Sequence, residues 1–146
     1  MRFYYNILLL CLILITGCSS SGSVAQTKAA TNVVQQIDLS KVKIVNIANL
    51  HTSFLNSRDA SPHHETVIEI KGDVVAFSLT EDNLYTVTLR EGDSDAICYF
   101  NNSISDEIGN GMKIHSGATL TVRGQCFTSG LFSSKPFTLD GCRIVD

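Results

Sequence analysis

The stretch that decides the fold is Thr66-Val67-Ile68-Glu69-Ile70-Lys71-Gly72-Asp73-Val74-Val75-Ala76-Phe77. Apolar and charged residues alternate along it, and a period of two predicts a half-buried strand. Gly72 falls in mid-strand, where a residue without a side chain indicates a bend or a close backbone approach. A strand bent at its centre can serve both sheets of a small barrel. The inward-facing set is Ile68, Ile70, Gly72, Val74 and Ala76.

Four later segments also have the pattern of strands. They are 84–90, 96–100, 117–127 and 137–145. Between the second and third lies a break, 101–116, where Ser103 and Asp106 can cap one helical turn. Three strands, a helical turn and two strands follow the order of an OB-fold, a five-stranded Greek-key barrel. We therefore predict a mainly all-β chain with this fold, with an open five-stranded sandwich as the alternative. Gly141 is expected to host a bulge in the last strand.

The N-terminus has the organisation of an export signal. Arg2 precedes an apolar run, 7–15, that is too short to span a bilayer. The next residues, Ile15-Thr16-Gly17-Cys18, resemble the lipobox of bacterial lipoproteins. That resemblance implies a lipoprotein signal peptide over 1–17, cleavage before Cys18 and diacylglycerol on the Cys18 sulfur. An ordinary signal peptide with a chance cysteine is the alternative.

The following residues divide into a tether and a domain. Residues 18–36 are small and polar, and we expect them to form a flexible tether behind the lipid anchor. Residues 37–146 are assigned to the OB-fold domain, which opens with a short amphipathic helix carrying Leu50 and Phe54. Because Ser19 and not Asp follows Cys18, the lipoprotein resemblance implies a place in the cell envelope, at the outer membrane facing the periplasm.

The ordered set of segments resembles the tRNA_anti-like family of small bacterial OB-fold lipoproteins. The match runs from Leu50 to the end of the chain and departs from the family pattern at Phe127 and in the glycine-rich segment 101–116. The resemblance implies an OB barrel, and the family name records a likeness to anticodon-binding domains. The matching pieces are Leu50…Phe54-Leu55-Asn56…Ala60, Ile68 to Val74, Cys98-Tyr99-Phe100, Gly117…Leu120 to Cys126, and Leu139 to Ile144.

Three cysteines remain in the expected domain. In the OB strand order 1-2-3-5-4-1, Cys98 and Cys126 lie two strands apart, roughly 9–10 Å, which is too far for a disulfide. Cys142 can pair with Cys126, its expected partner across the last hairpin, or with Cys98. Three buried thiols are the alternative. No cofactor motif or close metal-ligand spacing is present, so no metal or cofactor is expected.

The function predicted from these features is a non-enzymatic binding or interaction module. No nucleophile and base can be placed together from the sequence. OB-folds bind with the outer face of their second and third strands and with the neighbouring loops. An envelope protein or a glycan is the expected partner; a structural domain without a small ligand, or an OB protein for nucleic acid or oligosaccharide, is the alternative. The candidate binding surface comprises Thr86, Thr88, Arg90, Tyr99, Leu131 and Phe132.

The charge of the barrel argues against a nucleic-acid partner. From Glu65 onward six Lys and Arg stand against twelve Asp and Glu. Affinity for a phosphate backbone comes from basic residues that displace condensed counterions. On this ground no nucleic acid is expected.

The lipid anchor is directly testable. Replacing Cys18 with Ser removes the sulfur that would carry diacylglycerol, so the variant should take up no labelled palmitate and should stay uncleaved or soluble. Metabolic labelling followed by fractionation measures both. Unchanged labelling of the variant would end the lipoprotein interpretation.

Overall fold

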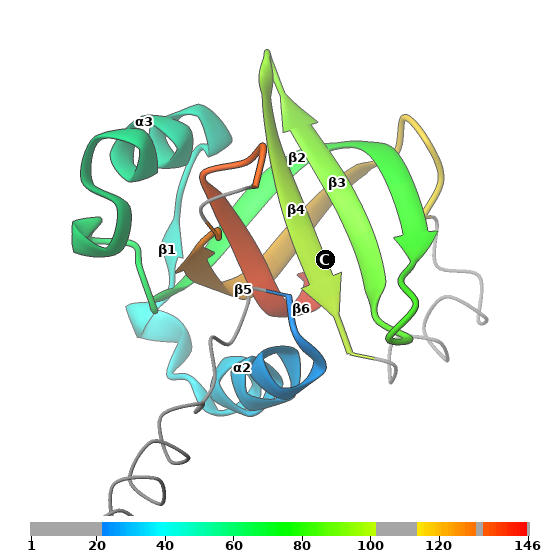
Figure 1. Cartoon of the computed structure of the whole chain (residues 1–146), viewed down its shortest axis with the longest axis horizontal. Helices are drawn as coiled ribbons and strands as arrows, with labels where there is room; N and C mark the ends of the chain where they lie inside the picture. Colours follow the sequence, from blue (N-terminus) through cyan, green and yellow to red (C-terminus); the bar gives the residue numbers. More distant parts are fainter. Residues whose placement is uncertain (1–21, 102–113, 131–132, 146) are drawn as a thin grey trace, which may run out of the picture.

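The computed structural model describes residues 22–101, 114–130 and 133–145, and their strands form a closed barrel (Figure 1). The strands are β2 (Val67–Leu79), β3 (Tyr85–Glu91), β4 (Ser94–Phe100), β5 (Thr119–Thr128) and β6 (Phe137–Val145). They lie in the order β2-β3-β4-β6-β5, and a further β2–β5 pairing closes the ring. This is the OB-fold strand order, so the predicted fold is confirmed. The predicted helical turn over 103–108 lies outside the described residues.

The long strand β2 closes the barrel because it pairs on both edges. Its first half, from Val67 to Asp73, pairs with β5, and its second half, from Asp73 to Leu79, pairs with β3. Gly72 lies at the changeover, where an added Cβ would lie 2.9 Å from the Arg90 carbonyl oxygen. The close approach expected at this glycine is confirmed. Ala76, expected to face inward, is exposed because the β2–β3 register shifts between Val74 and Ala76.

The β5–β6 hairpin contains the predicted bulge. Arg123 pairs with Arg143 and Gln125 pairs with Asp140, so Gly141 and Cys142 together face Gly124. Gly141 has a φ of +64°, a backbone conformation that favours glycine. The bulge kinks β6 at the point where it meets the first described helix.

The predicted N-terminal helix is α3 (Ile47–Ser57), and it is tied to the barrel at its start. The Asn46 side chain caps it by accepting from the amides of Ala48 and Asn49. Glu91, at the end of β3, accepts from the Ile47 amide at 2.7 Å. The helix buries Ile47, Leu50 and Phe54 against the strands. Three short elements flank this helix in the sequence. Before it come the 3-10 turn η1 (Leu39–Lys41) and the strand β1 (Lys43–Ile44), which pairs in parallel with β2; after it comes the 3-10 turn η2 (Arg58–Ala60).

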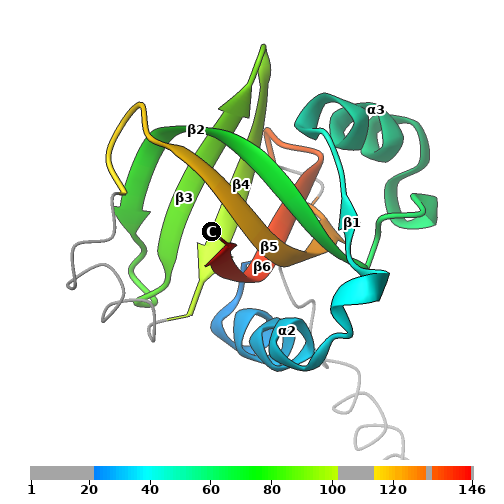
Figure 2. The same cartoon turned by 180° about the vertical axis from the view of Figure 1, so that it is seen from behind.

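An additional helix, α2 (Val24–Gln36), corrects the expected tether. Residues 24–36 were expected to be flexible, but they pack along β5 and β6 (Figure 2). Thr27, Ala30 and Val34 form one buried stripe at helical spacing, and Ser23 caps the helix through its hydroxyl. The prediction was wrong because it counted large apolar residues, whereas small side chains suffice where two backbones approach closely.

A buried carboxylate joins this helix to the barrel. Asp140 of β6 is fully buried, and its Oδ2 accepts from the Gly22 amide at 3.3 Å and from the Gln26 side chain. Burial raises the pKa of Asp140 to about 6, although both hydrogen bonds favour the charged form. The start of α2 is therefore held by a specific polar contact as well as by packing. No helix among the described residues is long and apolar enough to cross a bilayer.

The three cysteines of the domain lie in the barrel core. Cys98, Cys126 and Cys142 are buried and free in this structure, as in the alternative of three thiols. The thiol of Cys142 donates to the Leu139 carbonyl at 3.4 Å, and burial and the neighbouring Cys98 thiol raise its pKa. Cys98, one of the two predicted partners, is thus a neighbour of Cys142. A disulfide that involves Cys142 stays a prediction.

The packing of α2 on the bulge can be tested with a matched pair of glycines. An alanine Cβ at Gly141 would lie 2.2 Å from the Thr31 amide nitrogen, whereas one at Gly92, with a similar φ of +59°, would touch nothing. Gly92→Ala should cost about 1 kcal/mol of unfolding free energy from backbone strain alone. Gly141→Ala should cost about 1–3 kcal/mol more, because α2 must move. Equal losses in urea unfolding would show that α2 does not pack there.

Candidate ligand cleft beside the β5–β6 loop

A cleft of about 190 Å³ opens between α3 and the loop that joins β5 to β6. Its floor includes Phe54, whose ring stacks on Phe137 with centroids 5.3 Å apart. Arg58 stands on the helix side, and Ser129, Ser133, Ser134 and Lys135 stand on the loop side. Two cations, hydroxyl groups and an aromatic floor therefore converge on one small space.

Arg58 reaches the cleft from a strained backbone. It follows the last residue of α3 with a φ of +47°, one of the few positive values at a residue other than glycine among those described. Such a conformation costs of the order of 1–3 kcal/mol and is found more often at functional sites than elsewhere. Its side chain is exposed and has no carboxylate partner within the described part of the chain. The guanidinium is thus available to an anionic ligand.

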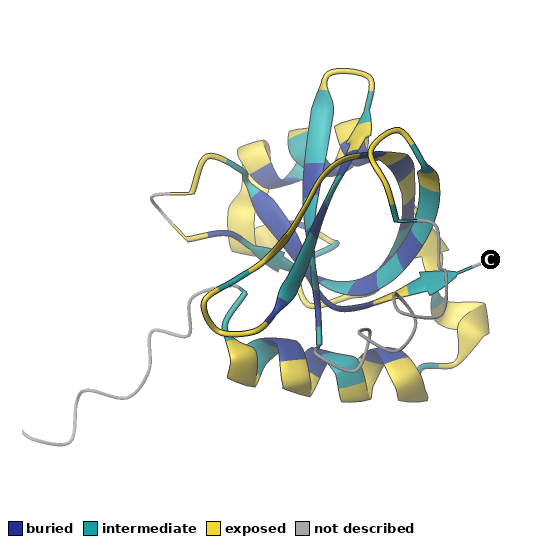
Figure 3. Cartoon of the chain, turned by 90° about the vertical axis from the view of Figure 1, so that its right-hand side faces the viewer, coloured by how far each residue is buried: buried dark blue, intermediate teal, exposed yellow. Residues whose placement is uncertain are grey.

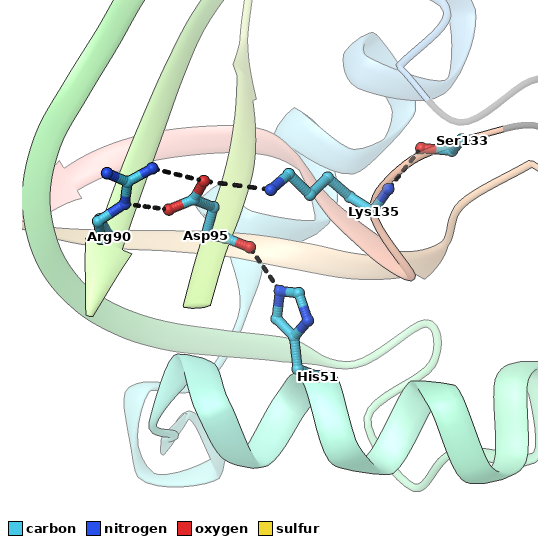
Figure 4. A network of polar contacts seen from close by, with 5 residues as sticks. All are labelled: His51, Arg90, Asp95, Ser133 and Lys135. Atoms are coloured by element: carbon cyan, nitrogen blue, oxygen red, sulfur yellow. Dashed lines mark hydrogen bonds and ion pairs between the residues drawn. The ribbon is translucent and has the colours of Figure 1, made fainter. Parts of the chain in front are cut away.

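Lys135 belongs to a polar network at the edge of the cleft (Figure 4). Its Nζ lies 3.1 Å from Asp95 Oδ2, and its backbone amide donates to Ser133 Oγ at 3.2 Å. Asp95 also accepts from Arg90 Nε at 2.7 Å, and its carbonyl oxygen lies 2.7 Å from His51 Nε2. The network fixes the loop against β4 and α3, so the lysine is positioned before any ligand arrives.

Asp95 is the electrostatic centre of this network. Its hydrogen bond with Arg90, with help from Lys135, lowers the pKa of Asp95 to about 2. The carboxylate takes up much of the charge of both cations. Arg90 is therefore bound to Asp95 on the neighbouring strand β4. Arg58 has no carboxylate partner among the described residues.

The predicted binding surface is only partly assembled. Thr86 and Tyr99 face each other across β3 and β4, and Thr88 lies next along β3. Tyr99 is half-buried, and its ring lies against Gly22, where an added Cβ would meet it at 2.5 Å. Burial raises the pKa of the Tyr99 hydroxyl, with a smaller contribution from the charge of Asp140. Leu131 and Phe132 lie outside the described residues.

The cleft contains residues that the sequence did not single out. Arg58 was not among the candidate binding residues, because nothing in the sequence around it indicates a positive φ. Lys135 lies close in the sequence to the candidate residues Leu131 and Phe132 but was not chosen with them. Among the described residues, no group of three or more His, Cys, Asp or Glu side chains could hold a metal ion.

Comparisons with known proteins concern the fold. No family model matches the sequence, and no curated protein matches it. A solved structure from Klebsiella pneumoniae, named a "putative nucleic acid-binding lipoprotein", is 20% identical over 74% of this chain and 95% of that chain, with a TM-score of 0.57. At this identity the likeness shows a shared OB-fold.

Two further solved structures are less similar to this chain. An aspartyl-tRNA synthetase of Leishmania major is 13% identical over 75% of this chain and 22% of its own, with a TM-score of 0.49. A chain in the structure of yeast Stn1 and Ten1 is 16% identical over 80% of this chain and 70% of its own length, with a TM-score of 0.47. The chain thus spans less than a quarter of the synthetase, and neither likeness carries an argument about its ligand.

The expectation that no nucleic acid is bound is contradicted by the Klebsiella protein, whose printed name includes nucleic-acid binding. The expectation rested on net charge, and net charge does not fix where charges lie. Here Arg58 and Lys135 meet at one cleft although acidic residues outnumber basic ones in the whole chain. The total charge was the wrong quantity to argue from.

The Asp95 network predicts a specific dependence of stability on pH. A carboxyl whose folded pKa lies below its unfolded value of about 3.9 stabilises the protein above pH 4 and loses that contribution as the pH falls toward 2. Asp95→Asn should cost about 1 kcal/mol at pH 7, because Arg90 is half exposed and solvent screens the pair. Urea unfolding should show the difference from the native chain vanishing near pH 2. The exposed Asp82→Asn is the control, and a pH-independent difference would contradict the account.

Proposed function

We propose that this chain is a lipid-anchored, non-enzymatic binding module of the bacterial cell envelope, related to the tRNA_anti-like lipoproteins. The lipobox-like segment before Cys18 and the likeness to a protein named as a lipoprotein support the anchor. The proposed location is the outer membrane, with the barrel facing the periplasm. The OB-fold supports a role in binding, since this barrel holds oligonucleotides and oligosaccharides in many proteins.

The single observation that carries the proposed binding role is the unpaired Arg58 at the cleft beside Lys135. A guanidinium forms two parallel hydrogen bonds with a phosphate or carboxylate, and it is weakly hydrated compared with an ammonium group. The serine hydroxyls of the β5–β6 loop supply further donors. The cleft therefore suits one anionic group of a longer ligand that continues over the outer face of β3.

Single-stranded nucleic acid is the favoured ligand class. Its phosphates match the unpaired guanidinium of Arg58, and its bases can stack on exposed rings of an OB barrel. Phe77 of β2 is such an exposed ring, and it stacks on the half-buried Tyr85 of β3 with centroids 5.8 Å apart. A charged glycan or an acidic segment of an envelope protein are the alternatives that the experiment below separates.

A role in binding rather than catalysis is supported by the chemistry of the cleft. The Ser129 hydroxyl is buried without a hydrogen-bond partner, and Ser133 Oγ accepts from a backbone amide. The nearby histidine, His51, is held by the Asp95 carbonyl. Within the described part of the cleft no serine is hydrogen-bonded to a base, which nucleophilic catalysis requires.

The proposed site predicts a selective effect of Arg58. Anisotropy of labelled single-stranded DNA and RNA should show saturable binding to the lipidated protein in detergent, weakening with added salt. Arg58→Ala should weaken binding about ten-fold and lower the slope of log affinity against log salt by about 1. Lys71→Ala, which removes the same charge from the exposed face of β2, is the control.

Two outcomes would count against this assignment. Equal effects of Arg58→Ala and Lys71→Ala would mean that binding is not at the cleft. No binding of either nucleic acid, together with binding of an acidic oligosaccharide or peptide that Arg58→Ala abolishes, would keep the cleft and replace the ligand class.

A further inference from the structure

One side of the molecule differs from the rest in charge and in exposed apolar surface. We call it the α2–η1 surface, and it consists of Val33, Ile37, Leu39, Lys41 and Lys43. Leu39 is 63% exposed and Val33 is 43% exposed. Figure 3 shows α2 along the side of the barrel, with its buried positions turned toward the strands and its exposed positions turned outward.

Two shallow grooves meet at this surface. Val33, Lys41 and Lys43 line a groove of about 260 Å³, which also includes Glu65. Leu39 and Arg143 line a second groove of about 410 Å³, where Arg123 is already paired with Glu69. Ile37 lines both grooves, so the exposed apolar side chains and the lysines are close neighbours.

The segment that carries this surface is richer in lysine than the barrel. Residues 22–43 contain three lysines and one carboxylate, Asp38. From Glu65 onward the acidic residues are twice as many as the basic ones. Lysines beside exposed apolar side chains are the composition of segments that lie in a membrane interface, where the apolar groups enter the acyl boundary and the ammonium groups meet anionic headgroups.

The chain leaves little distance between the start of α2 and the expected anchor. Gly22 is held to the barrel by its hydrogen bond to Asp140, and α2 follows at once. Only four residue steps separate Gly22 from Cys18, which at most span about 14 Å at 3.3–3.6 Å per residue. If Cys18 is acylated, as the proposed function requires, the start of α2 must stay close to the headgroups.

We propose that the α2–η1 surface lies against an anionic phospholipid bilayer and orients the barrel on it. The lipid chains hold the protein to the membrane. Contacts of Leu39, Lys41 and Lys43 with the bilayer determine which side of the barrel faces the membrane. In Figures 1 and 2 α3 and the β3–β4 turn lie at the end of the molecule opposite to α2. The ligand cleft beside α3 therefore faces away from the bilayer.

The experiment uses the lipidated full chain on vesicles. An environment-sensitive fluorophore is attached at Leu39→Cys or, as a control, at Asp93→Cys in the β3–β4 turn. The native Cys98, Cys126 and Cys142 are buried and should not be labelled. Vesicles contain either phosphatidylglycerol with phosphatidylethanolamine or phosphatidylcholine alone, and flotation measures attachment separately. The probe at position 39 should brighten at least two-fold on the anionic vesicles only, and the probe at 93 should not change.

Charge variants then test the source of the orientation. Lys41→Glu combined with Lys43→Glu should abolish the response at position 39 while flotation persists, and Lys71→Glu should leave the response unchanged. Protein that floats but gives the same emission at 39 and 93 would overturn the proposal and leave the anchor intact. Protein that does not float would overturn the anchor, and the proposed orientation with it.

Discussion

The structure depends on the double pairing of one strand. The first half of β2 pairs with β5, and its second half pairs with β3. One strand can form both pairings only if it bends at its centre. At the bend a Cβ on Gly72 would lie only 2.9 Å from the Arg90 carbonyl oxygen and 3.1 Å from the Leu89 Cβ, so a larger residue would force the strands apart. Without that approach the ring would stay open, and an edge of the sheet would be exposed to other chains.

The barrel could be predicted because its signals are local. Alternation along 66–77 and 117–127 marks the strands, and their order around one break defines the topology. The bulge at Gly141 could be predicted for the same reason. The exposure of Ala76 could not, because it arises from a shift of register against β3 that depends on the partner strand.

The second helix and the cleft depend on tertiary contacts and so escaped prediction. The stripe of Thr27, Ala30 and Val34 buries little apolar area, and its stability comes from the approach to Gly141 and from Asp140. The cleft combines the end of α3 with a loop some seventy residues later, and only the closed barrel brings them together. Of the predicted surface, the sequence placed Thr86, Thr88, Arg90 and Tyr99 correctly on neighbouring strands but could not show that Arg90 is engaged by Asp95.

The contact between α2 and β6 also limits how the segment before the barrel can move. A flexible tether of nineteen residues would let a barrel turn freely and reach far from its anchor. Folding of 24–36 onto the strands removes most of that freedom, since Gly22 is already bound to Asp140 and only a few residues remain before Cys18. If Cys18 carries the proposed lipid anchor, the folded helix leaves only a short connection to it, and the start of α2 is the part of the barrel domain nearest to that anchor. In that proposed arrangement a ligand would reach the barrel from the side of α3, where Arg58 has no carboxylate partner among the described residues.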